Sequence, residues 1–109
     1  MTGIAHLPEP PYTAVIFSSL RTEGDQGYAV MGARMQELAR KQPGYLGYES
    51  SRAESGFGVT VSYWTDDDAA RAWKQVHEHA IAQQRGQETW YTDYQVRVAR
   101  VERAYGPHG

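Results

Sequence analysis

The apolar residues of this chain recur with a period that switches between two and about 3.6 residues, and the order of these switches limits the available folds. Alternating patterns predict strands and helical stripes predict helices, in the order strand, helix, strand, strand, helix, strand. The expected strands are 12–20, 45–54, 57–64 and 89–105, and the expected helices are 28–39 and 66–86. Elements of these lengths make a two-layer α+β sandwich with a four-stranded antiparallel sheet.

Length and composition indicate one domain without a broad charged surface. The 109 residues carry a formal net charge of -2, with acidic and basic residues mixed along the chain, so we expect no nucleic-acid partner. The chain has no cysteine and no apolar run near the roughly 20 residues that cross a bilayer, which favours a cytoplasmic protein without membrane contact. We expect one domain over 12–105, an extended N-terminal arm over 1–11 and a short tail over 106–109.

The first expected strand has apolar side chains on both faces. Ala14 and Ile16 fall on one face, whereas Val15 and Phe17 fall on the other. Because the helices can cover only one face of the sheet, the opposite face needs a partner. We therefore predict a homodimer in which two sheets pack face to face and enclose a space between them.

The pattern also predicts two local features. Thr65 followed by Asp68 matches a capping box, which places the start of the second helix there. In the last strand the apolar residues change face near Arg100, which indicates a β-bulge at that point.

Aromatic and small polar residues mark a candidate ligand pocket. Gly58, Thr60 and Ser62 share the less bulky face of the third strand, Trp64 ends that strand, and Trp73 lies on the helix that follows. This arrangement leaves room for a flat aromatic ligand beside indole rings and hydroxyl groups. The further candidate substrate-binding residues are Ser18, Tyr48, Gln83, Trp90 and Tyr94, and Tyr91 lies with the last two at the start of the final strand, where these rings would close the space.

The candidate catalytic residues are Trp73 and His79. His79 lies at the edge of the apolar stripe of the second helix and is the best available base. Each candidate also has a structural interpretation: Trp73 as ordinary core, Trp64 as packing in a dimer, and His79 as a surface histidine. His77 and His79 point away from each other on a helix, so we expect no metal site there.

The element order, the turn at Gln42-Pro43-Gly44-Tyr45, the strand end at Ser62-Tyr63-Trp64 and the helix that carries Trp73 resemble the antibiotic biosynthesis monooxygenase family. The resemblance covers roughly 12–105 and implies a ferredoxin-like βαββαβ sandwich that pairs into a dimeric α+β barrel. Members of this family include cofactor-independent oxygenases that convert polyketide phenols or anthrones to quinones, and relatives that degrade haem.

The resemblance also allows a test for a haem cofactor. The haem-degrading relatives use an asparagine near the end of the first strand, a tryptophan on the second helix and a histidine further along that helix. The corresponding positions here hold Ser18 or Ser19, Trp73 and Gln83. Because an amide is a poor substitute for imidazole as an axial iron ligand, we expect no cofactor, and haem is disfavoured.

The resemblance implies a cofactor-independent monooxygenase that acts on a small aromatic metabolite such as a polyketide-like phenol or an anthrone. One alternative is a non-catalytic dimer that binds an aromatic or haem-like ligand. Another is an accessory protein whose interior is filled by packed aromatic rings. A cavity of roughly several hundred Å³ with inward polar groups would favour either of the first two over the third.

Overall fold

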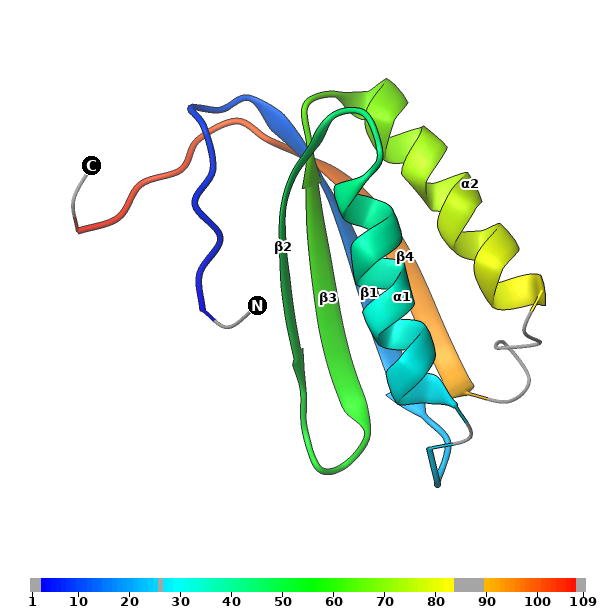
Figure 1. Ribbon diagram of the computed structural model, residues 1–109. Helices are drawn as coiled ribbons and strands as arrows, with labels where there is room; N and C mark the ends of the chain where they lie inside the picture. Colours follow the sequence, from blue (N-terminus) through cyan, green and yellow to red (C-terminus); the bar gives the residue numbers. More distant parts are fainter. Residues whose placement is uncertain (1–2, 26, 84–89, 108–109) are drawn as a thin grey trace.

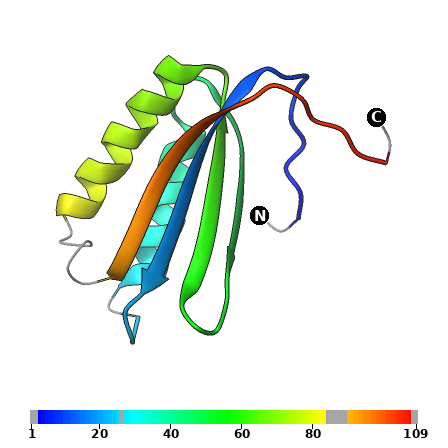
Figure 2. The same cartoon turned by 180° about the vertical axis from the view of Figure 1, so that it is seen from behind.

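A four-stranded antiparallel sheet with both helices on one face forms the protein (Figure 1). The computed structural model describes residues 3–25, 27–83 and 90–107; the predicted helix end at 84–86 and strand start at 89 lie outside them. The elements are β1 (Tyr12–Arg21), α1 (Tyr28–Arg40), β2 (Tyr45–Arg52), β3 (Phe57–Trp64), α2 (Asp67–Gln83) and β4 (Tyr91–Val101). The strands lie in the order β2-β3-β1-β4, and Figure 2 shows the sheet from the side without helices. The predicted sandwich and its βαββαβ order are confirmed.

β1 is a central strand, flanked by β3 and β4. Its side chains Val15 and Phe17 face the helices and belong to the buried core, as the two-sided apolar pattern predicts. Ala14 and Ile16 point the other way, onto the face that carries no helix. We call this the open face; its side chains include Ile16, Ser18 and Leu20 of β1 and Phe57, Val59, Val61 and Tyr63 of β3.

β4 pairs with β1 without a bulge at Arg100, so that prediction was wrong. The register is regular from Val101 to Asp93 and shifts only at the far end of the strand. The apolar residues change face because Val96 and Val98 lie on the helix side, whereas Val101 lies on the open face. β4 is an edge strand and is exposed over most of its length, so neither of its faces needs a continuous apolar row.

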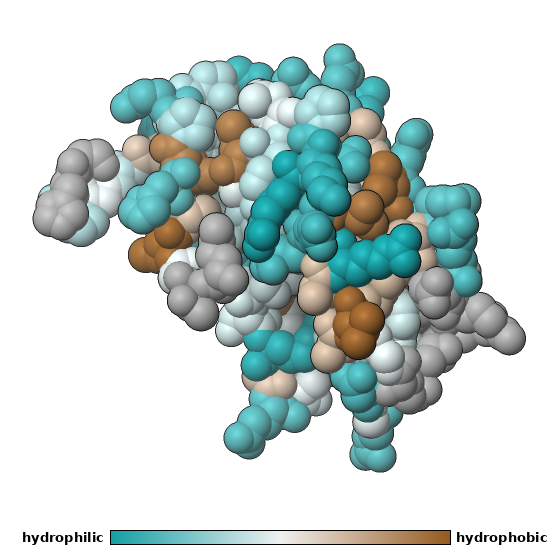
Figure 3. All heavy atoms as spheres, viewed as in Figure 1, coloured by the Kyte–Doolittle hydropathy of each residue, from teal (hydrophilic) through white to brown (hydrophobic). Residues whose placement is uncertain are grey.

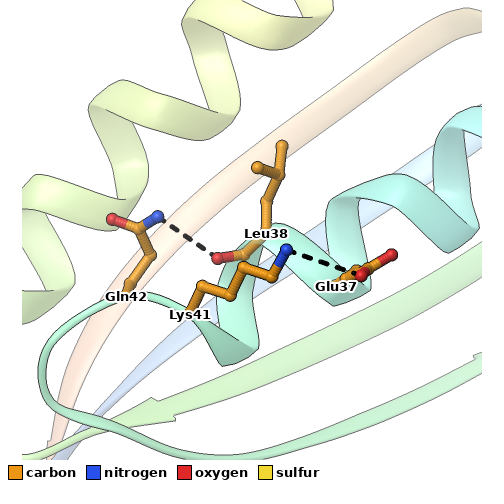
Figure 4. Close-up of polar contacts among 4 residues, drawn as sticks. All are labelled: Glu37, Leu38, Lys41 and Gln42. Atoms are coloured by element: carbon orange, nitrogen blue, oxygen red, sulfur yellow. Dashed lines mark hydrogen bonds and ion pairs between the residues drawn. The ribbon is translucent and has the colours of Figure 1, made fainter.

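α1 ends where the sequence predicts a stop. The side-chain amide of Gln42 donates a hydrogen bond to the Leu38 carbonyl at 3.2 Å, which satisfies one of the free carbonyls of the last turn (Figure 4). Lys41 pairs with Glu37 at 3.5 Å on the exposed side of the helix. These contacts close the helix before the turn into β2.

α2 begins with Asp66 as its cap, so the predicted pairing of Thr65 with Asp68 was wrong. The Asp66 Oδ1 atom accepts a hydrogen bond from the Ala69 N–H at 2.8 Å. Thr65 instead packs on the turn after α1, where its N–H donates to the Gly44 carbonyl at 2.9 Å. Gly44 has φ 83°, and a Cβ there would lie 2.6 Å from Thr65 Oγ1, so this turn requires glycine.

The N-terminal arm lies against the open face beside β2 (Figures 1 and 2). The Ala5 N–H donates to Glu49 Oε2 at 3.0 Å, and the Tyr63 hydroxyl donates to Glu49 Oε1 at 2.6 Å. A Cβ on Gly47 would lie 2.8 Å from the Leu7 side chain, so the missing side chain allows the arm to approach. The arm therefore covers the β2 side of the open face.

The helix side of the molecule is mainly hydrophilic, with apolar residues in separate patches (Figure 3). Arg71 and Asp67 form an ion pair at 2.8 Å on the outer side of α2, and both are exposed. Within the described ranges, no helix is long and apolar enough to cross a membrane.

Candidate functional site

A cavity of about 60 Å³ lies between the helices and the sheet, inside the single chain. We call it the helix–sheet cavity. Its apolar walls come from both helices and from β1 and β4, and they include Val15, Phe17, Met31, Met35, Ile81 and Val96. Hydroxyl groups and an imidazole lie among these apolar walls, as is typical of sites that orient a largely apolar ligand.

Ser62 lines this cavity and is held in place by Trp64. The Trp64 Nε1–H donates a hydrogen bond to Ser62 Oγ at 2.9 Å. Trp64 is fully buried, and its ring stacks on that of Trp73 with centroids 5.6 Å apart and planes 23° apart. Because an indole nitrogen can only donate, the Ser62 oxygen is the acceptor and its own proton is left for a ligand.

Tyr48 and Thr60 place two further hydroxyl groups on the cavity wall, from β2 and β3. Burial raises the pKa of the Tyr48 phenol to about 12, and a hydrogen bond with Thr60 acts in the opposite direction. Thr60 Oγ1 is also hydrogen-bonded to Ser50 Oγ at 2.8 Å. Tyr48 therefore stays protonated at neutral pH and acts as a hydrogen-bond donor rather than as a base.

α2 places the imidazole of His77 on the cavity wall, one turn after Trp73. Its ring meets Phe17 edge-on at a centroid distance of 5.1 Å, and Trp73 at 5.7 Å. Burial lowers the pKa of His77 to about 4, although the nearby Glu78 carboxylate acts to raise it. The imidazole is therefore neutral at neutral pH, with one ring nitrogen free to accept a proton from a bound acid.

Two tyrosines form a further part of the wall, and two arginines contact one of them from outside the cavity. Tyr28 and Tyr91 line the cavity, and Arg52 Nη2 donates to the Tyr28 hydroxyl at 3.2 Å. The guanidinium carbon of Arg21 lies 3.8 Å from the centre of the Tyr28 ring. Burial and a hydrogen bond to Tyr28 raise the pKa of Tyr91 well above its usual value. Two arginines thus lie behind the phenols of this part of the wall, without lining the cavity themselves.

The structure brings five of the predicted site residues together. Tyr48, Ser62, Trp73 and Trp90 line the helix–sheet cavity. Trp64 lies directly behind Ser62 and contacts Trp73.

The other four predicted site residues lie outside the cavity. Ser18 is on the open face, and Tyr94 is 37% exposed on β4, where its ring packs against Phe17. His79 and Gln83 are exposed on α2. The described part of the chain also contains no cluster of three or more side chains that could hold a metal ion.

His77 and Tyr28 line the cavity but were not among the predicted site residues. For His77, the missed signal is its spacing: Trp73 lies one turn before it and Ile81 one turn after it, so all three share one side of α2. For Tyr28, the signal is its position in the apolar stripe of α1. Tyr91, expected beside Trp90 to close the space, also lines the cavity.

The location of the cavity differs from the predicted space between two sheets. The small residues Gly58, Thr60 and Ser62 face the helices, so the free volume lies beneath α1 and α2 within one chain. Its volume of about 60 Å³ is also well below the several hundred Å³ that would favour a ligand-binding function over an interior filled by aromatic rings. A tricyclic ligand therefore requires the lining side chains to move, and the flexible thioethers of Met31 and Met35 are placed to do so.

Comparison with known proteins finds a matching family profile and a similar uncharacterized protein. The sequence profile of the family described as antibiotic biosynthesis monooxygenase matches residues 11–85. The chain is 50% identical over 103 residues to the uncharacterized protein YqjZ of Bacillus subtilis (strain 168), which covers 94% of this chain and 90% of that protein.

Solved structures share the fold at low sequence identity. A variant of SnoaB, a cofactor-independent oxygenase from Streptomyces nogalater, superimposes with a TM-score of 0.70 at 16% identity, over 88% of this chain and 97% of that one. A protein from Pseudomonas aeruginosa gives a TM-score of 0.62 at 20% identity, over 90% of this chain and 99% of that one. At these identities the likeness shows a common fold.

Proposed function

Because the chain belongs to the antibiotic biosynthesis monooxygenase family, we propose that it is a cofactor-independent monooxygenase for a small aromatic metabolite, such as a polyketide-like phenol or an anthrone. The observation that carries this proposal is the neutral imidazole of His77 on the wall of an aromatic cavity that also presents hydroxyl groups. The similarity in fold to SnoaB, itself a cofactor-independent oxygenase, supports it.

The proposed reaction needs only the substrate and dioxygen. A base removes a proton from the acidic CH₂ group of an anthrone, or from a phenol, and leaves a delocalised anion. The anion transfers electrons to O₂, and a carbon–oxygen bond forms at the deprotonated carbon of an anthrone or at a ring carbon of a phenolate that shares the negative charge. One oxygen atom becomes the new quinone carbonyl, and the other leaves as water. In an anthrone both hydrogens of this water come from the CH₂ carbon; in a phenol one comes from the hydroxyl group and one from the ring carbon that is oxygenated. The substrate is oxidised and dioxygen is reduced, without a further reductant.

The residues of the cavity match the requirements of this reaction. His77 accepts the proton, because its buried imidazole is neutral before substrate binds. The hydroxyls of Ser62 and Tyr48 donate hydrogen bonds to the oxygen on which negative charge develops. Trp73 and Trp90 supply the flat walls. The low pKa of His77 makes it a weak base in the empty cavity, so the substrate anion itself must stabilise the imidazolium that forms.

Oxygen consumption with an anthrone tests this proposal. We expect uptake above the spontaneous rate, a loss of about 100-fold or more in His77→Ala, and a smaller loss in Ser62→Ala. His79→Ala is the matched comparison, since His79 lies on the same helix but is exposed. Loss of activity in His79→Ala with an unaffected His77→Ala would return the catalytic role to His79. No uptake above the spontaneous rate in the unmodified protein would contradict the monooxygenase proposal.

The weak basicity of His77 also favours a second candidate function. In it, the protein binds an aromatic or haem-like ligand without turnover. The same experiment separates the two functions when ligand binding is measured alongside oxygen uptake: binding without uptake supports the binding protein.

We further propose that the chain forms a homodimer through its open face. Leu20 and Phe57 of this face are 40% and 50% exposed, and Ile16, Val59 and Val61 lie beside them. A second copy packed on this face would bury these side chains. The ligand would then occupy the helix–sheet cavity of each subunit, away from the dimer contact.

A further inference from the structure

We propose that the helix–sheet cavity binds an aromatic ligand through an anionic oxygen, either phenolate or carboxylate, which accepts a hydrogen bond from the Tyr28 hydroxyl beside the Arg52 guanidinium. This inference rests on the proposed function only in placing the ligand in the same cavity. It adds the charge of the ligand and the residues that recognise it.

Arg52 brings a positive charge to the helix side of the sheet. Its Nη2 atom donates to Ser19 Oγ at 2.7 Å and to the Tyr28 hydroxyl at 3.2 Å, and its Nη1 atom donates to the carbonyls of Ser19 and Gly56. All of these acceptors are neutral. Among the described residues, no carboxylate lies within ion-pair distance of Arg52, so its charge is not balanced by a fixed partner.

Gly58 on β3 provides the space that Arg52 occupies. A Cβ at this position would lie 2.6 Å from the guanidinium carbon and 2.9 Å from each terminal nitrogen. Any larger residue would push the guanidinium away from Tyr28. The absence of a side chain at Gly58 is therefore what allows Arg52, which is part-buried, to cross β3 and reach the phenol.

Tyr28 is the group through which this charge reaches the cavity. Its oxygen accepts a hydrogen bond from Arg52 at 3.2 Å, and its ring meets that of Tyr91 edge-on with centroids 5.9 Å apart. With the Arg52 donor directed at its oxygen, the Tyr28 hydroxyl has its own proton left to donate. A phenol polarised in this way is a strong hydrogen-bond donor to an anion.

The other charged groups around the cavity do not provide a competing anion site. Lys74 lines the cavity but pairs with Glu78 at 2.8 Å. His77 is neutral. Arg21 stacks on Tyr28 and donates to backbone carbonyls, including that of Asp25 at 3.3 Å. The Asp25 carboxylate accepts hydrogen bonds from backbone N–H groups. The excess positive charge thus lies at the Tyr28 side of the cavity.

An optical titration with para-nitrophenol tests the proposal, because this phenol changes its absorption when it ionises. We expect the protein to bind the phenolate about tenfold more tightly than the phenol, which lowers the pKa of the bound probe by about one unit. Benzoate should compete with it, whereas para-nitroanisole, which cannot ionise, should bind more weakly than the phenolate. Competition by benzoate shows that the site also accepts carboxylates; its absence restricts the site to phenolates.

Variants then assign the effect to Arg52 and Tyr28. Arg52→Met, Tyr28→Phe and Gly58→Ala should each remove most of the preference for the anion, and Arg52→Lys should retain part of it because the charge remains. Arg40→Met is the matched control, since Arg40 is exposed at the end of α1. Circular dichroism checks that each variant is folded, and Arg52→Lys keeps the test informative should Arg52→Met fail to fold.

The outcomes separate this inference from the proposed reaction. Equal binding of phenol and phenolate by the unmodified protein, or a preference that survives in folded Arg52→Met, overturns the anion site. A preference for the anion that depends on Arg52, without oxygen uptake from an anthrone, supports the site and counts against the monooxygenase. Failure to bind any of these aromatic compounds overturns both.

Discussion

The indole N–H of Trp64 donates a 2.9 Å hydrogen bond to the hydroxyl of Ser62, two residues earlier on the same face of β3. Both side chains are almost completely buried. Trp64 thus does not line the cavity itself but fixes the orientation of a hydroxyl that does. The bond explains why a large aromatic residue ends the strand whose other helix-facing residues are small.

A double-mutant cycle should detect this hydrogen bond. Trp64→Phe leaves the Ser62 oxygen without its donor, and Ser62→Ala leaves the indole N–H without its acceptor, so each change should lower the free energy of unfolding. We expect a coupling energy of about 1 kcal/mol between the two changes, measured by urea denaturation. Strictly additive single and double variants would show that the bond contributes nothing measurable.

The buried histidine predicts a specific pH dependence of stability. The pKa of His77 in the folded protein is about 4, against 6.5 for an unperturbed histidine. Between these values the unfolded chain binds the proton more readily, so the free energy of unfolding should fall as the pH drops through this window. The loss at its lower end is about 3 kcal/mol.

Paired variants isolate the contribution of His77 from that of other titrating groups. His77→Phe should flatten the decline in stability below pH 6.5, whereas His79→Phe, at an exposed position, should leave it unchanged. Denaturant titrations across the window provide the measurement. The same slope in all three proteins would mean that His77 is accessible to protons in the folded state.

The turn between α1 and β2 should not tolerate a side chain at Gly44. Gly44→Ala places a methyl group 2.7 Å from the Ala69 side chain at a residue with φ 83°. We expect a loss of about 2 kcal/mol in the free energy of unfolding. Gly106→Ala is the control, because nothing lies within 4 Å of the new methyl group there. Equal stability of the two variants would contradict the close packing of this turn.

A charge on the open face should prevent dimer formation. Val59→Lys adds an unpaired ammonium group to the face that the proposed dimer buries, so light scattering should report a monomer. Val30→Lys is the control, because Val30 is 77% exposed on α1. A monomeric unmodified protein at micromolar concentration would refute the dimer.

The fold follows from the periodicity of the sequence, because each element buries one face against the other layer. The two-sided apolar pattern of Val15 and Ile16 places β1 at the centre, and the structure confirms it. The edge strand β4 is different: it has little core to bury, so its change of apolar face indicated a bulge that does not exist. Periodicity is informative where packing constrains both faces of an element.

The site could be predicted only in part, for a similar reason. Trp73 and Ser62 were found because large aromatic and small polar residues stand out along their elements. Which of the two histidines, His77 or His79, faces the cavity depends on how α2 is rotated about its own axis. The alanines of α2 lie on both of its sides: Ala72 is exposed, whereas Ala70 is buried on the same side as Ile81. In an alanine-rich helix the buried and exposed sides differ little in hydrophobicity, so the sequence gives little basis for predicting that rotation.

The arm that lies on Gly47 also affects how two copies of the chain can meet. Ala5 and Leu7 already lie over the outer strand β2 on that side, and the Ala5 N–H donates a hydrogen bond to Glu49. A subunit approaching this surface therefore cannot sit squarely over the midline of the sheet. In the proposed homodimer the two-fold axis would therefore lie nearer to β1 and β4, and deletion of the arm would let it return to the centre.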